Sequence, residues 1–317
     1  MNSKPRKSSL AFLGLLLTGL LFPSCLPERK SASKNPFAVP AQPDVPGNNL
    51  PAKTRAELGR MLFFDPLLSG SNARACVDCH RPGLGWADGS KRPRLENGAP
   101  GSAHVPSLFN IGFVREHYRG GKKKTLEELA ALAIVSPGQM NQNPEELVRE
   151  LGANEHYRYL IKRSYALRRL DIKTVSLALA NYMRTIISRD SSFDRWQEGD
   201  KNAIGDSAKQ GFRIFKGKAG CLQCHSGFNF SDGKRRPSTN GRLVRTPSLR
   251  DIALSSPYMH DGSRKNLHEV LDSHPAAFRS SKKAALTSEE KRLVIKFLIT
   301  LSGKKNPHAY PVLPRIH

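Results

Sequence analysis

Two short stretches of the sequence, Cys76-Val77-Asp78-Cys79-His80 and Cys221-Leu222-Gln223-Cys224-His225, share the pattern Cys-x-x-Cys-His. Within one helical turn, both cysteines of such a stretch lie on the same face, where their thiols can add to the two vinyl groups on one edge of a porphyrin. The histidine that follows can then bind the iron. Each stretch therefore predicts one c-type haem, with Cys76, Cys79, Cys221 and Cys224 as attachment points and His80 and His225 as iron ligands.

Paired Cys-x-x-Cys motifs can also form a zinc site or disulfides. Zinc sites of this kind usually separate the two pairs by about 15 to 20 residues, a far shorter interval than the one from Cys79 to Cys221. Zinc would also leave both histidines unexplained. Haem attachment is therefore the stronger interpretation, with zinc or a disulfide as the alternatives.

The amino terminus has the pattern of an export signal. Basic residues precede a charge-free apolar run from Leu10 to Phe22, which is too short to span a bilayer comfortably. The run ends at Leu21-Phe22-Pro23-Ser24-Cys25, which resembles the lipobox of bacterial lipoproteins except at Phe22 and Pro23. We expect residues 1–24 to be a lipoprotein-type signal peptide and Cys25 to carry the lipid. A plain cleaved signal that leaves Cys25 as a spare thiol is the alternative.

Either kind of signal places the mature chain in the periplasm, and the lipid would anchor it to a membrane there. Residues 25–50 are rich in Pro, Asn, Ser and Lys and poor in large apolar side chains, so they are expected to form a flexible tether. Four cysteines are assigned to haem and one to lipid. None is then left for a disulfide.

The chain carries a net charge of +24, spread along the sequence rather than gathered in one arm. Nucleic acid is the usual partner for such a charge, but an exported haem protein rarely meets it, so we expect no nucleic-acid binding. An acidic electron donor or an anionic membrane surface fits the compartment better. A solvated basic surface with no dedicated partner is the alternative.

The two haem motifs belong to an internal repeat. Gly59-x-x-x-Phe63 precedes the first motif as Gly211-x-x-x-Phe215 precedes the second, and Pro106-Ser107-Leu108 follows the first as Pro247-Ser248-Leu249 follows the second. The order is kept while the spacing changes, as expected of a duplicated unit whose loops differ in length. The repeat predicts two cytochrome c-like domains, at 51–190 and 191–303, with a tail at 304–317.

The expected secondary structure is mainly helical. Asn143-Pro144 and Thr287-x-x-Glu290 have the form of helix starts, and apolar residues recur at helical spacing over 172–187. Segments 81–105 and 226–247 are rich in Gly, Pro, Arg and Lys and are expected to be loops. The fold class is thus mainly α, as two helical domains with one covalently bound haem each.

Further residues in the same order carry a family resemblance: Leu58 to Pro66, Ile187-Ser188-Arg189, Phe193-Asp194-Arg195, Gly217-Lys218-Ala219, Thr246 to Leu254 and Pro257 to Gly262. Together with the haem motifs, over nearly all of residues 54 to 303, they make the chain resemble the bacterial dihaem cytochrome c peroxidases and the related MauG proteins. In that family the amino-terminal haem receives peroxide and the carboxy-terminal haem accepts electrons from a donor.

The resemblance implies that His80 binds the peroxide-site haem and His225 the electron-transfer haem. The sixth ligand of the second haem, Met in peroxidases and Tyr in MauG, falls on His274 in this chain. A helix capped by Asn266 would end there, and an imidazole in place of a thioether should lower the reduction potential. Met259 is the rival ligand, and His260 is expected to serve the hydrogen bonding of its own loop.

The first haem shows a departure from the family. Its peroxidases place a Gln and a Glu over the peroxide, and here those positions fall on Leu129 and Gln139. A carboxamide can orient peroxide by hydrogen bonds but cannot carry a proton at ordinary pH. His104, His117 and Glu128 are the candidates for moving protons instead.

Two further positions differ from the family. The Trp between its haems becomes Tyr118, which can still relay an electron if its proton is managed, and the Asn of its calcium site becomes His104, which weakens the case for calcium. Gln139, Tyr118 and His104 are accordingly the candidate catalytic residues. Family members often dimerise, so the resemblance permits a homodimer.

The function implied by the resemblance is reduction of hydrogen peroxide with electrons from a small periplasmic donor, a cytochrome c or a cupredoxin. The substituted distal residues leave two alternatives. One is MauG-like, peroxide-dependent oxidation of a protein or another substrate. The other is electron transfer or sensing by the two haems without peroxide turnover.

Overall fold

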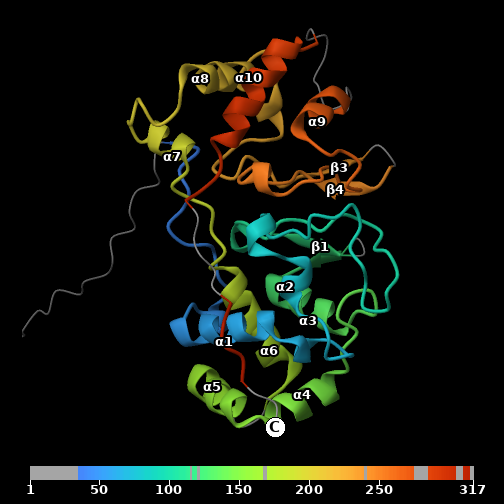
Figure 1. The fold of residues 1–317 in the computed structure, drawn as a ribbon. Coiled ribbons are helices and arrows are strands. Elements are labelled where there is room, and N and C mark those ends of the chain that lie inside the picture. Colours follow the sequence, from blue (N-terminus) through green and yellow to red (C-terminus); the bar gives the residue numbers. More distant parts are fainter. Residues whose placement is uncertain are drawn as a thin grey trace, which may run out of the picture. The chain divides into compact units, whose positions relative to one another are not determined.

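The computed structural model describes residues 35–114, 116–119, 122–166, 170–238, 241–274, 285–304 and 310–314. The expected signal peptide and Cys25 lie outside these ranges. The helices and strands are α1 (Lys53–Phe64), α2 (Cys76–Cys79), β1 (His117–Arg119), β2 (Lys122–Lys124), α3 (Leu126–Val135), α4 (Pro144–Ala153), α5 (Glu155–Tyr165), α6 (Ile172–Met183), α7 (Ser192–Gln197), α8 (Asp206–Lys216), β3 (Arg235–Pro237), β4 (Leu243–Arg245), α9 (Leu267–Ser273) and α10 (Ser288–Ile299) (Figure 1).

The helix starts follow the capping pattern of the sequence. The Asn143 side chain accepts from the Glu146 amide at 2.9 Å at the start of α4, and Thr287 and Glu290 form a reciprocal capping box at the start of α10. The helix expected over 172–187 begins after Asp171 and ends at Met183. The predicted helical fold class is confirmed. Within the described ranges, no helix is long and apolar enough to cross a membrane.

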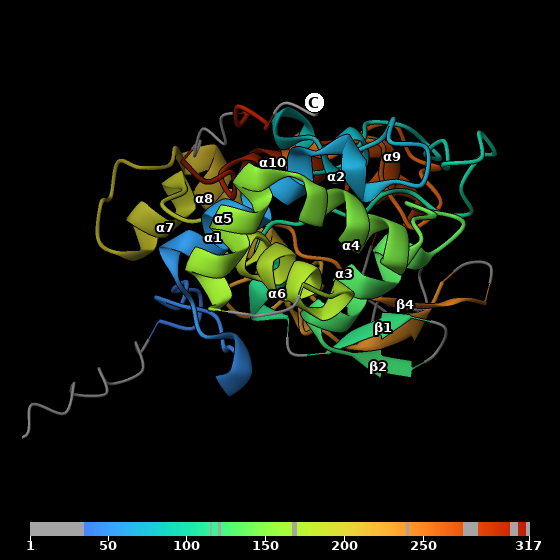
Figure 2. The ribbon, with the colours of Figure 1, turned by 90° about the horizontal axis from the view of Figure 1, so that it is seen from below.

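Residues 35–317 form one unit with two hydrophobic core clusters. The first core contains buried residues between Leu58 and Ile186 and is built on α1, α3, α4, α5 and α6. In Figure 1, α4 and α5 lie below α1 and α6, and in Figure 2, seen from below, they lie in front of them. The second core contains buried residues between Phe193 and Leu301 and is built mainly on α7, α8 and α10.

The glycines of the repeat mark equivalent helix crossings. A Cβ on Gly59 of α1 would lie 2.0 Å from the Ala178 carbonyl oxygen of α6, and a Cβ on Gly211 of α8 would lie 1.9 Å from the Leu293 carbonyl oxygen of α10. No side chain fits in such a gap. Each glycine therefore lets one pair of helices approach closely ahead of a haem motif.

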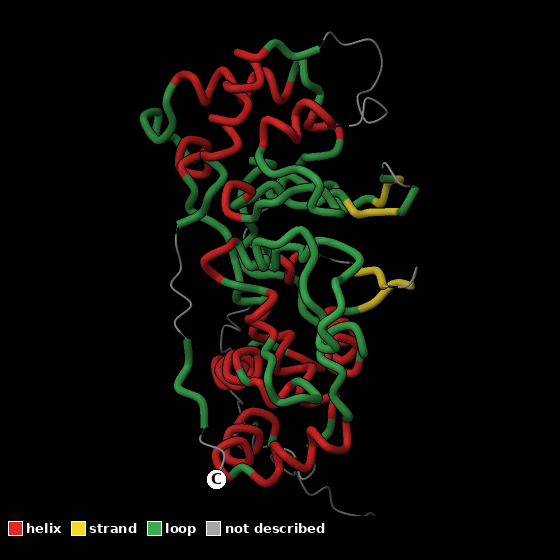
Figure 3. Tube along the Cα trace, turned by 45° about the vertical axis from the view of Figure 1, so that its right-hand side comes forward, coloured by secondary structure: helices red, strands yellow, loops and turns green. Residues whose placement is uncertain are grey.

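In the described parts of the chain, four short strands lie within the loops. β1 pairs with β2 and β3 pairs with β4, both antiparallel, so part of the segment expected to be a loop at 226–247 is a hairpin. Figure 3 shows the two hairpins in yellow on the same side of the tube. The two hairpins are close enough for charges to interact, because the positive charge of Arg245 in β4 lowers the pKa of His117 in β1.

The expected tether is wrong for residues 35–50. The ring of Phe37 stacks on Phe230 with centroids 5.2 Å apart and joins the second core. Asn49 is fully buried, and its side-chain amide donates to Glu127 Oε1 at 2.7 Å. Composition did not predict this because two anchoring side chains, rather than the average of the segment, hold it in place.

Part of the carboxy-terminal tail packs on the first core. The Tyr310 ring meets Phe64 of α1 edge to face, with centroids 4.9 Å apart, and Leu313 contacts the same core. Residues 310–314 therefore return from the second core to the first, which contains α1.

Candidate haem sites

The first Cys-x-x-Cys-His motif forms a tight, fully hydrogen-bonded turn. The Asp78 carboxylate accepts from the Ala75 amide at 2.9 Å, and the His80 amide donates to the Cys76 carbonyl at 3.0 Å. Cys76 and Cys79 are both half-buried on this turn. The backbone thus presents both thiols and the histidine from one short segment.

The His80 ring is oriented by a hydrogen bond. Its Nδ1 lies 3.0 Å from the Trp86 carbonyl oxygen, which leaves Nε2 for a metal. Trp86 is 1% exposed, and its ring packs on Phe63. The Phe63 ring also lies beside the His80 ring, with the two ring centroids 6.4 Å apart. Burial lowers the pKa of His80, so the imidazole is held in its neutral, ligating form.

The second motif repeats this arrangement. The His225 amide donates to the Cys221 carbonyl at 2.8 Å, and Nδ1 lies 3.0 Å from the Phe230 carbonyl oxygen. Burial is the main cause that lowers the pKa of His225 to about 4, and the nearby His274 lowers it further. Trp86 and Phe230 thus have the same role in the two halves of the chain.

His274 is the residue that faces His225. It is the C-cap of α9, whose N-cap Asn266 accepts from the Glu269 amide as expected. The two imidazole centroids lie 6.4 Å apart with an interplanar angle of 67°. Two imidazoles that share one metal at about 2 Å from each nitrogen have centroids about 6 Å apart. The spacing therefore fits two imidazoles that would hold one iron.

The loop that carries the rival ligand is strained. Met259 has φ 71°, and the neighbouring His260 has a buried Nε2 with no hydrogen-bond partner among the described residues. A polar group of a bound cofactor could provide the hydrogen-bond partner that this buried nitrogen lacks. The two Cys-x-x-Cys-His motifs do not converge on a common zinc site, because no three His, Cys, Asp or Glu side chains in the described ranges are grouped to hold a metal ion.

The expected distal residues lie on and after α3. Leu129 is half-buried on this helix, and Gln139 is exposed in the turn that follows it, where its amide donates to the Ser136 carbonyl at 2.9 Å. Glu128 is occupied in a capping box, since its carboxylate accepts from the Thr125 amide at 2.7 Å. The structure thus gives Glu128 a structural role at the helix start.

His104 links two loops. Its amide donates to the His260 carbonyl at 3.0 Å, and its Nδ1 lies 2.9 Å from the Ser90 carbonyl oxygen. The amide contact reaches the loop that contains His260, in the half of the chain with the second haem motif. The ring contact reaches the loop that contains Ser90, which follows the first haem motif. His104 therefore joins the two loops directly through its backbone and its ring.

His117 lies in a buried, charged environment. It is 6% exposed, and burial together with Arg245 and Arg184 lowers its pKa to about 4. It lines a cavity of about 300 Å³ with Glu127 and Arg184, which form an ion pair at 2.7 Å. Tyr118 follows it in β1, and the Tyr118 side chain is outside the part of the chain that the structure describes.

Sequence reasoning missed the carbonyls of Trp86 and Phe230, which lie 3.0 Å from the Nδ1 atoms of His80 and His225. The available signal was an aromatic residue six or five positions after each histidine. A backbone carbonyl can come from any residue type, so the signal was weak.

Comparisons with known proteins agree with this geometry. The family model described as di-haem cytochrome c peroxidase matches residues 53–202. The chain is 33% identical to the methylamine utilization protein MauG of Methylorubrum extorquens, over 90% of this chain and 88% of that protein. It is 29% identical to the cytochrome c551 peroxidase of Nitrosomonas europaea, over 82% and 83% of the two chains.

Solved structures share the fold. A MauG-like protein associated with microbial copper homeostasis superposes with a TM-score of 0.75 at 24% identity, covering 86% of this chain and 96% of that one. The diheme peroxidase BthA of Burkholderia thailandensis gives 0.64 at 19% identity, covering 84% and 92%. On the strength of the sequence relatives, this chain belongs to the family of dihaem cytochrome c peroxidases and MauG proteins, and it is a dihaem c-type oxidoreductase.

Proposed function

We propose that this protein reduces hydrogen peroxide at the His80 site with electrons that enter at the His225 site. The observation that carries the assignment is the inequality of the two sites. His225 faces a second imidazole at 6.4 Å, whereas the ring that contacts His80 in the described part of the chain is Phe63, which cannot bind iron. A site with two protein ligands suits electron transfer, and a site with one leaves room for peroxide.

Bound at these sites, c-type haem would supply the iron that binds peroxide and the redox couple that passes electrons. The protein contributes the rest. Cys76 and Cys79 attach the first haem and Cys221 and Cys224 the second, while the carbonyls of Trp86 and Phe230 keep each ligating imidazole in one tautomer. The Gln139 carboxamide would orient peroxide, and Tyr118 would relay electrons between the two sites.

A second candidate is peroxide-dependent oxidation of a protein or another substrate. Two relatives above 30% identity are named methylamine utilization protein MauG, at 33% and 32%. A neutral imidazole at His274 donates strongly to oxidised iron, and this would help the second site to hold oxidising equivalents. Haem-based electron transfer without peroxide turnover is the third alternative.

Stopped-flow spectroscopy of the haem-loaded protein separates these functions. With peroxide and a reduced cytochrome c donor, a peroxidase gives sustained donor oxidation at two donor electrons per peroxide. The MauG-like function predicts a rapid change of the haem spectrum with peroxide alone and little donor turnover. A protein that changes its spectrum with reductants but not with peroxide is an electron-transfer module, and that result would exclude both peroxide functions.

We further propose a periplasmic location with Cys25 lipidated, and a small donor protein, a cytochrome c or a cupredoxin, with an acidic docking surface. The charge-free run before Cys25 and the net charge of +24 support these assignments. The direct contact of His104 with the His260 carbonyl supports a loop junction that holds without calcium. A homodimer is the assembly that we propose from the resemblance.

A further inference from the structure

The carbonyl that orients the histidine of each haem motif belongs to a residue with an unusual backbone conformation. Trp86 has φ 61° and Phe230 has φ 48°, and both residues are fully or nearly fully buried. A bulky residue in this left-handed region is strained, and such a conformation persists only where the surrounding packing holds it. Because the direction of the carbonyl follows from this conformation, the packing around each aromatic ring determines whether the histidine keeps its hydrogen-bond partner.

The two halves of the chain share part of this packing. Phe63 of α1 contacts Trp86 with ring centroids 5.9 Å apart, and Phe215 of α8 contacts Phe230 with centroids 6.2 Å apart. Phe63 and Phe215 occupy equivalent positions of the sequence repeat. The contact between a helix aromatic ring and the residue that orients the histidine is therefore duplicated together with the haem motif.

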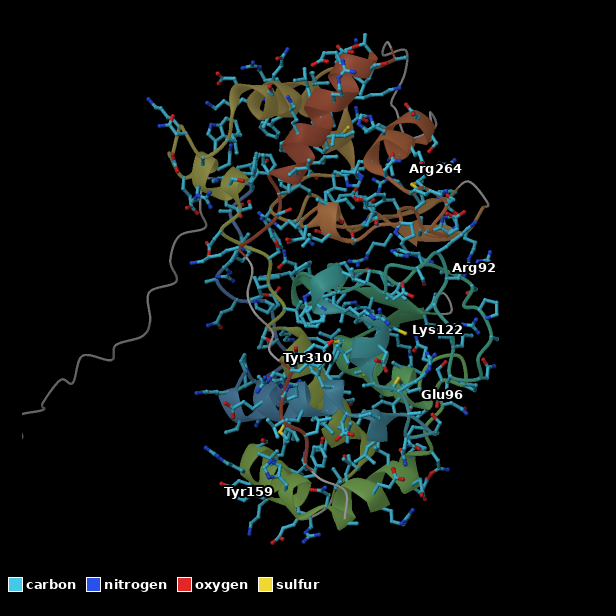
Figure 4. The ribbon with its side chains drawn as sticks, viewed as in Figure 1. Arg92, Glu96, Lys122, Tyr159, Arg264 and Tyr310 are labelled. Atoms are coloured by element: carbon cyan, nitrogen blue, oxygen red, sulfur yellow. The ribbon has the colours of Figure 1, made fainter. Side chains whose placement is uncertain are left out.

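The second half has a further ring that comes from outside the repeat. Phe37 stacks on Phe230 with centroids 5.2 Å apart and an interplanar angle of 16°, and it meets Phe193 of α7 edge to face at 5.5 Å. Figure 4 shows, with the colours of Figure 1, the blue segment before α1 running from beside α7 toward α1. The amino-terminal segment thus packs directly on the residue whose carbonyl orients His225.

The backbone of Phe37 is joined to the same part of the fold. Arg250 is 2% exposed and donates from Nη2 to the Phe37 carbonyl at 3.3 Å and from Nε to the Phe228 carbonyl at 2.6 Å. Its guanidinium is itself oriented by two hydrogen bonds of 2.8 Å to Asp194. One buried guanidinium therefore connects the amino-terminal segment to the loop that follows the second haem motif.

We propose that Phe37 is a positioning residue for the histidine ligand of the second haem. Its ring holds Phe230 in the left-handed conformation, which keeps the Phe230 carbonyl 3.0 Å from His225 Nδ1. A hydrogen bond from Nδ1–H to a carbonyl makes an imidazole more basic, and a more basic ligand stabilises oxidised iron. Phe37 thereby lowers the reduction potential of the second haem. The use of that potential for electron entry rests on the proposed function of the His225 site, whereas the positioning itself does not.

The test is a spectroelectrochemical titration, without peroxide, of the haem-loaded protein carrying F37Y, F37L or F37A. F37Y keeps the ring and should retain both wild-type potentials. F37A removes the packing on Phe230 and should raise the potential of the second haem by about a tenfold change in its reduction equilibrium, which is about 59 mV. F37L keeps apolar bulk without a ring and should give a smaller rise. The first haem should be unchanged in all three variants, because Trp86 orients its histidine.

W196L is the matched control. Trp196 packs on the same core, and its ring contacts Phe193 and Phe212, neither of which orients a histidine. W196L should lower the urea midpoint of unfolding, as F37L does, but should leave both potentials unchanged. A second-haem potential that is unchanged in F37L and F37A, or that W196L raises equally, would overturn the positioning role. If F37A does not retain both haems, the comparison of F37L with W196L still decides.

A second readout follows the hydrogen bond itself. Exchange of the His225 Nδ1 proton with deuterium, followed by NMR of the oxidised protein, should be faster in F37L than in wild type and unchanged in W196L. If exchange and potential respond in this way while the protein consumes no peroxide, the proposed function is wrong but the positioning role holds. If peroxide is reduced and neither exchange nor potential responds, the proposed function holds and the positioning role is wrong.

Discussion

At the scale of the residue, one hydrogen bond repeats at both haem motifs. The Nδ1 atoms of His80 and His225 each lie 3.0 Å from a backbone carbonyl, of Trp86 and of Phe230. Both carbonyls belong to fully buried or nearly fully buried residues, so the contact is shielded from water. The two histidines differ in the ring that each faces, because His274 faces His225, whereas Phe63 contacts His80.

His274→Met should raise the reduction potential of the second haem, because a thioether donates less strongly to oxidised iron than an imidazole. We expect a rise on the order of 100 mV, well inside the roughly 0.8 V range that axial ligands span. A spectroelectrochemical titration measures it. Met259→Leu is the control and should leave the potential unchanged. A shift in M259L without one in H274M would assign the ligand to Met259.

Gln139→Glu should accelerate peroxide cleavage, because it places a carboxyl group at the position that the family uses for acid-base work. Stopped-flow mixing with peroxide measures the rate. An unchanged rate would show that protons reach the site by another route.

At the scale of the element, the repeat is a pair of helix crossings. α1 crosses α6 at Gly59, and α8 crosses α10 at Gly211, each with a backbone carbonyl where a side chain would begin. Beyond these crossings, Asn110 and Asp251 take left-handed conformations, at φ 58° and 55°, just after the Pro-Ser-Leu segments of the two halves. The residues that recur in both halves are therefore found where two helices cross closely or just before a residue with a left-handed backbone conformation.

Gly59→Ala and Gly211→Ala should each destabilise the protein by about 1 to 3 kcal/mol, because the new methyl group forces the paired helices apart. Gly152→Ala is the control. Gly152 lies in α4 with nothing within 4 Å of an added Cβ, so alanine there should stabilise by about 0.5 to 1 kcal/mol. Denaturant unfolding of the three variants measures the changes. Equal effects at Gly59 and Gly152 would contradict close crossing as the reason for the repeat.

At the scale of the whole molecule, distant segments meet in charged, buried contacts. Arg250 is buried and makes two hydrogen bonds of 2.8 Å with Asp194, which anchors the second core. His117 of β1 shares its surroundings with Arg184 of α6 and Arg245 of β4. A proton on His117 would add a third positive charge to that environment.

This arrangement predicts acid sensitivity. The unfolded chain takes up a proton on His117 near its ordinary pKa of about 6.5, whereas the folded chain takes it up only near pH 4. The unfolded state therefore binds more protons between these values, so stability falls as pH drops from about 6.5 to about 4, by at most a few kcal/mol. His117→Gln should reduce the difference in urea midpoint between pH 5 and pH 7.5. His156→Gln, at an exposed histidine of α5, should leave it unchanged, and an equal reduction in both variants would contradict the assignment.

Haem attachment, the helix starts at Asn143, Asn266 and Thr287, and the duplicated plan were all predictable from the sequence. Each depends on residues within a few positions of one another, so spacing and side-chain chemistry suffice. The family followed from many such local motifs in one order. The tether prediction was wrong for residues 35–50, because Phe37 and Asn49 find their partners far along the chain.

Only the tertiary structure determined which residues surround the two haem motifs. It brought His274 to 6.4 Å from His225 across about fifty intervening residues and packed Tyr310 on Phe64. These contacts depend on long-range packing, which local spacing does not encode. The sequence alone thus determined that two haems bind, and the packing around them determined how the two sites differ.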